Sequence, residues 1–355
     1  MTPFFSIIVP CCDVEPYVCE CLDSMLNQPF TDWECLIGVE TSKDKTEEIV
    51  REYAAKDARF KVFTGPRSGS CSASRNTGID MATGEYVIFL DGDDTIVEGS
   101  LQRLHDKIAA RPGADRYSCA MLVYEDKTGL ELERRDNYPS DFSGELTGPS
   151  AILAFGHFWQ QHFCPMLQLA VFRRLFLQER HLRCIHGLRC QDSEFTPRAI
   201  YLSKRIIPLH EMFYLYRVRA ESIQTSAKGA GYFLKDWAII FRSLLAFHNS
   251  VVRDQDFDRR ITKYWCQQWI TGIFSFWFDK RSLRDIPRQN RVETIKLLFS
   301  NGYGDLVALL DGSSIKRKFA ALWMVAFAEL PPLRWCAEQF FVRLYIPLTK
   351  LKGEK

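Results

Sequence analysis

The sequence predicts an α/β fold with a mostly parallel sheet flanked by helices. Three observations predict it: short apolar runs rich in β-branched residues, one-sided helical stripes between them, and regular alternation of the two over the first hundred residues. Short, continuously apolar runs are typical of strands buried on both faces. Strands separated by helices pair in parallel with right-handed crossovers, and such sheets bind ligands at the carboxyl ends of their strands.

Each element of the alternation has its own signal. The first strand covers residues 4–9, and Pro10 is expected to end it. The first helix, with Pro16 in its first turn, carries apolar side chains on one face, at Val18, Cys21, Leu22, Met25 and Leu26. The following elements are a strand at 33–39, a helix around 49–54, a strand at 60–63, a helix at about 71–81 and a strand at 86–90.

The rest of the chain is less regular. Residues 124–149 are polar and turn-rich, which predicts a hairpin or a loop. Beyond about residue 230, aromatic-rich helical patterns predict a helical C-terminal extension. A stretch of small residues near Lys228 and Gly229 marks the expected boundary. It would separate an N-terminal domain of residues 1–228 from an accessory region of residues 229–355.

Composition excludes several classes of protein. The net charge of +2 argues against a nucleic-acid binder. The chain opens on a strand-like run, so no secretory signal is expected, and no apolar stretch reaches the roughly 18–20 residues of a membrane span. The cysteines include no CxxC pair or zinc spacing, and we interpret them as reduced, buried residues of a cytoplasmic protein rather than as disulfides or metal ligands.

Three carboxylates follow the fourth predicted strand, in the run Asp91-Gly92-Asp93-Asp94. Packed together they would repel one another unless a cation lay between them. Mg²⁺ and Mn²⁺ suit this chemistry because they bind through one or two carboxylates plus substrate phosphates, and Gly92 would let the backbone approach a ligand. The alternative is an Asp-rich turn that caps the next helix.

Several further segments match one family in the same order. They are residues 6–10, 17–18, 21–24, 27–28, 33–34, 74–79, 82–86, 91–94, 172–174, 191–195, 216–219 and 222–223. Over about its first 225 residues the chain therefore resembles the family 2 inverting glycosyltransferases, which have the Rossmann-like GT-A fold. The resemblance implies a nucleotide-sugar donor, in which Asp91 holds the ribose hydroxyls, Asp93 ligates Mn²⁺ or Mg²⁺ and Asp94 orients its neighbours.

The nucleobase end of the donor site departs from the family pattern. Relatives carry two Asp residues after the second strand, where this chain has Val39 and Glu40. Glu40 can still accept a hydrogen bond from a uracil-like base, or it is a surface residue at a strand end. Pro10 would line the base site or simply end its strand. Arg75 would contact the base or a phosphate, the alternative being an ion pair across the sheet end.

The resemblance also assigns the reacting groups. Asp192 is the expected catalytic base, because direct displacement with inversion needs one carboxylate to take the acceptor's proton. Its neighbour Gln191 replaces an acid of the relatives, and Glu194 should lie too far along the helix to substitute. Arg219 stands where many relatives carry a metal-binding His, so we assign it to the diphosphate, with Ser222 adding a hydroxyl.

Three residues outside this set each have two possible roles. His210 could ligate a metal, although a lone His before a Tyr-rich strand is more often structural. Arg173 and Arg174 could either bridge helices or line the acceptor side. The sequence does not decide between these alternatives.

The C-terminal residues 316–352 combine basic and aromatic side chains with about a dozen apolar ones. They would either pack within a helical domain or dimer contact, or lie in a membrane interface at the inner face of the plasma membrane. The acceptor would then be a glycan or lipid-linked glycan hydroxyl in surface polysaccharide synthesis.

Two other functions have distinguishable signatures. A nucleotidyltransferase needs a Gly-rich basic loop after the first strand, unlike residues 11–14. A degenerate, non-catalytic nucleotide-sugar-binding module is the alternative favoured by Val39 and Gln191.

Overall fold

The computed structural model describes residues 2–162, 164–219, 236–244, 246–247, 250, 288–298, 322–323 and 325–340. The chain divides into two compact units, Met1–Ala220 and Glu221–Lys355. The expected domain boundary near residues 228 and 229 lies outside the described residues. Each unit is described by itself.

The N-terminal unit is built on a nine-stranded sheet. Its parallel part comprises, in spatial order, β3 (Phe60–Gly65), β2 (Trp33–Glu40), β1 (Phe5–Cys11) and β4 (Tyr86–Phe89). The sheet continues through β8 (Ala170–Arg173), β6 (Arg116–Glu125), β9 (Ile206–Val218) and β5 (Thr95–Ile96), with β7 (Glu131–Asp136) paired to β6. Because β8 is antiparallel to both β4 and β6, the sheet is mixed rather than wholly parallel.

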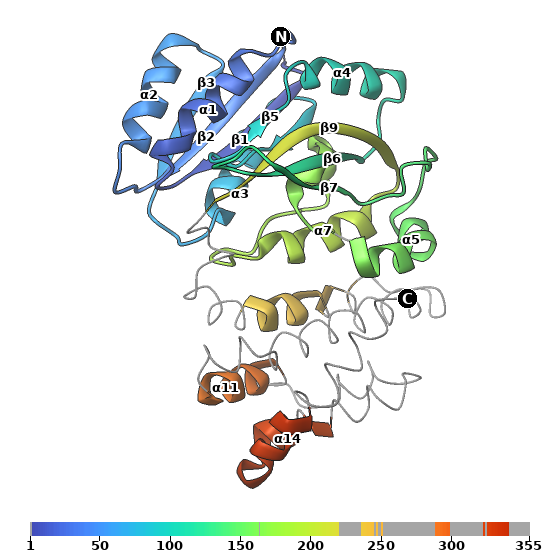
Figure 1. Cartoon of the computed structure of the whole chain (residues 1–355). Coiled ribbons are helices and arrows are strands. Elements are labelled where there is room, and N and C mark those ends of the chain that lie inside the picture. The colour runs from blue at the N-terminus through green and yellow to red at the C-terminus, as the bar shows by residue number, and fades with distance from the viewer. Residues whose placement is uncertain are drawn as a thin grey trace. The chain divides into compact units, whose positions relative to one another are not determined.

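Helices cover both faces of this sheet (Figure 1). On one face lie α1 (Glu15–Leu26), α2 (Thr46–Lys56) and α4 (Ser100–Ala110), whose apolar stripes pack with alternate residues of β1 such as Phe5 and Ile7. On the other face lie α3 (Ser72–Met81), α6 (Arg174–Glu179) and α7 (Gln191–Leu202), packed with Ile8 and the intervening residues of β2 and β4. Burial of both faces explains why these strands are apolar throughout.

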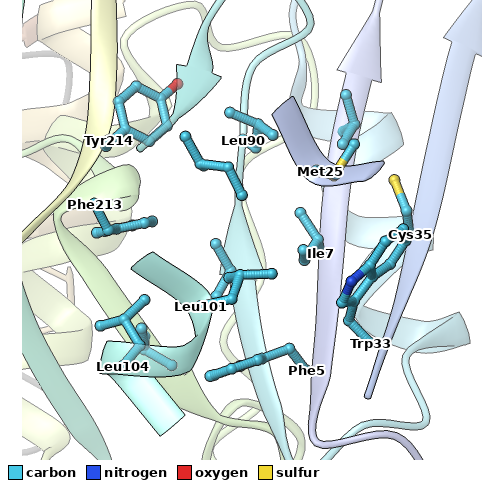
Figure 2. Packing of buried hydrophobic residues seen from close by; sticks show 14 of the residues in the cluster. Phe5, Ile7, Met25, Trp33, Cys35, Leu90, Leu101, Leu104, Phe213 and Tyr214 are labelled. Atoms are coloured by element: carbon cyan, nitrogen blue, oxygen red, sulfur yellow. The ribbon is translucent and has the colours of Figure 1, made fainter. Parts of the chain in front are cut away.

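The first of these layers forms the larger core. Figure 2 shows Met25 of α1 and Leu101 and Leu104 of α4 meeting β1 and β2 side chains, with Phe213 and Tyr214 of β9 closing the cluster. Every labelled residue in this view is at most 2% exposed. The core therefore joins the parallel half of the sheet to the strand that leads to Arg219.

The predicted strands and helices of the first hundred residues are confirmed, with one correction. Pro10 does not end β1, because the strand runs to Cys11 and Pro10 pairs in register with Gly38. The Pro10 carbonyl accepts a hydrogen bond from Gly92 N–H, on the side where β4 has already ended. The missing Pro10 N–H consequently removes no ladder bond.

The predicted hairpin at 124–149 is confirmed as the antiparallel turn from β6 to β7. The chain then forms α5 (Gly148–His162) and a short 3-10 helix, η1 (Leu167–Leu169), before β8. None of the cysteines among the described residues forms a disulfide. Cys19 is exposed rather than buried because it lies off the apolar stripe of α1.

The described parts of the C-terminal unit are helical. They include residues 236–244, α11 (Arg288–Leu298), η2 (Pro331–Leu333) and α14 (Arg334–Phe340). Trp323 and Phe340 stack at 5.6 Å, and Arg334 donates to the Phe327 and Ala328 carbonyls, contacts that favour internal packing for these residues. Residues 316–321 and 341–352 lie outside the described residues. Among those described, no helix is long and apolar enough to span a membrane.

Candidate active site

The site residues converge where the parallel strands end. Asp91 and Asp93 directly follow β4, Arg75 lies in the first turn of α3, Asp192 in the first turn of α7, and Arg219 just after β9. Burial raises the pKa of the nearby Cys71 thiol to about 12, and the charges of all three carboxylates add to that rise. Residues separated by more than a hundred positions therefore share one electrostatic environment.

Arg75 joins two of the predicted carboxylates. Its Nη2 lies 2.6 Å from Asp91 Oδ1, and its Nη1 lies 3.0 Å from Asp192 Oδ1. The guanidinium is buried while each carboxylate keeps 23% of its side chain exposed. This is the ion pair across the sheet end that the sequence offered as the alternative for Arg75. A direct contact of Arg75 with the donor stays a prediction.

Asp91 is held from two further directions. The Gln168 amide donates to Asp91 Oδ2 at 2.6 Å, and the Asp91 N–H donates to the Tyr214 hydroxyl at 3.2 Å. Both partners are buried. Arg75 and Gln168 therefore hold one oxygen each of the Asp91 carboxylate, while part of the Asp91 side chain stays exposed.

Asp93 and Asp94 have different roles. Arg219 grips Asp93 Oδ2 through Nε at 3.0 Å and Nη2 at 2.9 Å, and both side chains remain about a quarter exposed. Asp94 is buried and accepts hydrogen bonds from the Tyr214 hydroxyl at 2.5 Å and the Arg217 N–H at 2.8 Å. Asp94 therefore ties the acidic turn to β9, which fits the orienting role expected of it.

The electrostatics follow from burial and crowding. Burial raises the pKa of Asp93, and the neighbouring Asp91 charge raises it further, against the opposing effect of Arg219. The pKa of Asp94 is raised well above its usual range, first by burial and then by Asp93 and Asp91. The repulsion predicted from sequence is thus present, and protein cations and hydroxyls compensate part of it.

The donor set suits a metal only in part. Within the described residues no group of three or more His, Cys, Asp and Glu side chains is arranged to hold an ion. Asp93 nevertheless offers Oδ1, to which none of the described residues apart from Asp93 itself donates. One carboxylate oxygen fits Mg²⁺ or Mn²⁺, which complete their shells with water and substrate phosphates.

Asp192 has the properties of a base. Burial raises its pKa, Arg75 lowers it and the Asp91 charge raises it, with a net upward shift. Arg75 donates to Oδ1, and none of the described residues apart from Asp192 itself donates to Oδ2. The neighbouring Gln191 is buried with an unpartnered Oε1, whereas Glu194 is paired with Arg198, as its position further along α7 suggested.

Glu40 is buried at the end of β2 rather than lying on the surface. Its Oε2 accepts from the Ser68 N–H at 2.8 Å and its Oε1 from the Ser68 hydroxyl at 2.6 Å. Val39, which replaces the relatives' first acid, points into the core. The loop after β3 therefore orients Glu40, and the remaining lone pairs of its carboxylate can still accept from a base.

Gly92 is needed for packing as well as for any ligand. A Cβ at this position would lie 2.7 Å from Cys11 Sγ and 3.2 Å from the Pro10 carbonyl oxygen. The acidic turn consequently sits tightly on the end of β1, which places Pro10 beside it.

Other candidates have structural partners. His210 bonds the Asp136 carboxylate at 2.7 Å and the Phe142 carbonyl at 2.6 Å, the structural role that its context favoured. Arg173 pairs with Asp115, and Arg174 donates to the Gly84 carbonyl. Ser222 lies outside the described residues.

Sequence reasoning missed three residues that organise the site. Gln168 and Tyr214 hold the acidic turn, and Arg217 donates to the Asp93 carbonyl from between the rings of Tyr17 and Tyr124. Arg217 lies in a segment that carried the family resemblance, and this could have marked it as a site residue. Gln168 had none, because an isolated Gln in an irregular stretch carries no pattern.

Comparison with known sequences identifies the class. Residues 6–176 match the family model described as Glycosyl transferase family 2. The uncharacterized glycosyltransferase EpsJ of Bacillus subtilis is 32% identical over 226 residues, which are 63% of each chain. The GalNAc(5)-diNAcBac-PP-undecaprenol beta-1,3-glucosyltransferase of Campylobacter jejuni is 23% identical over 265 residues, covering 74% of this chain and 81% of that one.

Solved structures agree on the fold. S. aureus TarS 1-349 in complex with UDP-GlcNAc superposes with a TM-score of 0.68 at 20% identity, covering 95% of this chain and 91% of that one. The mannosyltransferase PcManGT of Pyrobaculum calidifontis, in complex with GDP-Man and Mn²⁺, gives 0.51 at 16% identity, covering 100% and 89%. The fold is therefore GT-A. Within the N-terminal unit, residues 6–176 match glycosyl transferase family 2.

Proposed function

We propose that this protein transfers a sugar from a nucleotide-diphosphate donor, a UDP-sugar, to a hydroxyl of a glycan or lipid-linked glycan, with inversion at the anomeric carbon. The observation that carries the proposal is the Arg75 bridge, because it brings the expected donor-binding Asp91 and the expected base Asp192 to one exposed point. The family match supports the reaction class, and the UDP-GlcNAc in TarS supports the donor class.

The reaction assigns one task to each of the predicted site residues. Asp91 accepts hydrogen bonds from the ribose hydroxyls, Glu40 accepts one from the base, and Arg219 neutralises diphosphate oxygens. The acceptor oxygen attacks the anomeric carbon and passes its proton to Asp192 Oδ2, while the bond to the diphosphate breaks and its electron pair leaves with the nucleoside diphosphate. The raised pKa of Asp192 favours this transfer, since a more basic carboxylate holds the proton better.

Asp93 would hold the divalent cation through Oδ1. Bound Mn²⁺ or Mg²⁺ supplies Lewis-acid stabilisation of the charge that develops on the departing diphosphate. The Mn²⁺ in the PcManGT complex, a protein with the same fold, supports this cofactor. Arg219 and a cation held by Asp93 would then both offset the negative charge of the diphosphate.

The relatives support a cellular setting. The Campylobacter relative is named as a glucosyltransferase of an undecaprenol-linked glycan, which supports a lipid-linked acceptor and surface polysaccharide synthesis. We place the protein in the cytoplasm, at the inner face of the plasma membrane, with residues 229–355 as an accessory region and residues 316–352 as the candidate membrane contact.

A panel of nucleotide sugars with Mn²⁺ tests the proposal, read as released nucleoside diphosphate. Asp192→Asn should lower the release rate about 10²–10⁴-fold, the usual contribution of a general base, and leave the Kd for UDP unchanged. Asp93→Ala should weaken UDP binding in the presence of Mn²⁺. Asp106→Asn, on the exposed surface of α4, is the matched control and should behave as wild type.

Two results would count against the proposal. Full turnover by Asp192→Asn would remove the base assignment. Tight UDP-sugar binding without any release, with or without acceptor, would favour the degenerate binding module instead.

A further inference from the structure

Arg75 is the most buried of the three site arginines Arg75, Arg217 and Arg219. Its side chain is 3% exposed, whereas that of Arg219 is 25% exposed. Its Nε has no hydrogen-bond partner among the described residues, and its guanidinium carbon lies 6.0 Å from the centre of the Phe89 ring. A ligand can therefore reach Asp91 and Asp192 while Arg75 stays beneath them.

The geometry of the bridge is specific to a guanidinium. Two nitrogens of one rigid plane contact one oxygen of each carboxylate, and the carboxylates come from different parts of the fold, the turn after β4 and the helix α7. The Arg75 plane thus fixes the angle between the two acids. A lysine ammonium is a single point charge on a flexible stem and cannot set that angle.

We propose that Arg75 is a positioning residue that aims Asp192 at the acceptor hydroxyl relative to the donor held by Asp91. This rests on the proposed function. This effect of Arg75 on transfer passes through the orientation of Asp192 and is separate from the donor contact that the sequence predicts for Arg75. The free Oδ2 of Asp192 then faces the acceptor side because Oδ1 is tied to Arg75.

The charges around Asp192 predict how the pH dependence of the rate should respond when Arg75 is replaced. Arg75 of α3 and Asp91 after β4 act on it directly, and the thiols of Cys71, Cys164 and Cys184 also lie within its electrostatic reach. Arg75 is the positive group among them, and it lowers the pKa of Asp192. Removing Arg75 should therefore shift the acid limb of the rate profile to higher pH.

The test compares two variants with a control. Arg75→Lys keeps the charge and should fold, yet kcat for release should fall at least about tenfold, since small misplacements at a reacting centre cost up to about 10²-fold. Arg75→Met should show a larger loss, with the acid limb of kcat moved upward in pH. Arg173→Lys changes another Arg–Asp pair, with the buried Asp115, and should leave kcat and its pH profile unchanged.

The outcomes separate this inference from the proposed function. If Asp192→Asn is inactive but Arg75→Lys keeps wild-type kcat, Arg75 does not position the base. The same conclusion holds if Arg75→Lys loses activity only in proportion to lost folded protein, measured by thermal melting. If the wild-type protein releases no nucleoside diphosphate from any donor, the proposed function itself is wrong.

Discussion

Arg219 and a divalent cation compete for the same carboxylate. In the structure Arg219 occupies Asp93 Oδ2 with two nitrogens, at 3.0 and 2.9 Å. A metal that binds before the donor must share or displace this guanidinium. Arg219→Gln should therefore raise the affinity for Mn²⁺ in the absence of nucleotide and lower the affinity for UDP, because the diphosphate loses a cation.

The expected change in the Kd for Mn²⁺ follows from how exposed the Asp93–Arg219 pair is. A charge-assisted hydrogen bond contributes about 1.5–3 kcal/mol when buried, and an exposed ion pair about 0.2–1 kcal/mol. With both side chains about a quarter exposed, the Asp93–Arg219 pair should contribute about 1 kcal/mol. Its loss corresponds to about a fivefold lower Kd for Mn²⁺.

Electron paramagnetic resonance of free Mn²⁺ measures this Kd directly, with and without UDP. Arg59→Gln is the matched control, since it removes the same charge from a pair with Asp57 of similar exposure, 29% and 23%. Equal Mn²⁺ binding by Arg219→Gln and wild type without UDP would refute the competition. Tighter binding by both variants would show only an effect of net charge.

Two further predictions concern stability. Arg116 is fully buried, and its Nε, Nη1 and Nη2 have no hydrogen-bond partner in the part of the chain that the structure describes. Arg116→Met should therefore raise the free energy of unfolding by about 1–3 kcal/mol. Urea denaturation checks this, and an unchanged or lower midpoint contradicts it. Burial would raise the pKa of Glu34, but hydrogen bonds from Lys61, Ser6 and Thr83 outweigh it and lower that pKa to about 2. Because the folded pKa lies below the unfolded one, about 2–3 kcal/mol of stability is present above pH 4.5 and is lost as the pH falls toward 2. Unfolding at pH 7 and pH 3 should show a larger decrease for wild type than for Glu34→Gln, and parallel decreases would argue against this role.

The sequence predicted the parallel half of the sheet almost residue by residue. Strand and helix there are local properties, since an apolar run or a one-sided stripe records which face of an element is buried. The acidic turn after β4 was also readable, because strand ends in such sheets carry ligand sites. Pro10 was misjudged because its tolerance depends on where the neighbouring strand stops.

The organisation of the site depended on contacts that no local pattern encodes. Arg75 meets Asp192 across 117 positions, and Tyr214 meets Asp94 across 120. Likewise, β8 enters between β4 and β6 in the antiparallel direction, which places Gln168 beneath Asp91.

The amino-acid sequence by itself determined the class of fold, the acids and the cations available for chemistry. Tertiary structure decided which acid each cation holds, and therefore which carboxylate oxygens remain open to substrates. The physical reason is that the spacing of apolar residues along one element shows which of its faces is buried, whereas ion pairing depends on the angles at which distant elements meet.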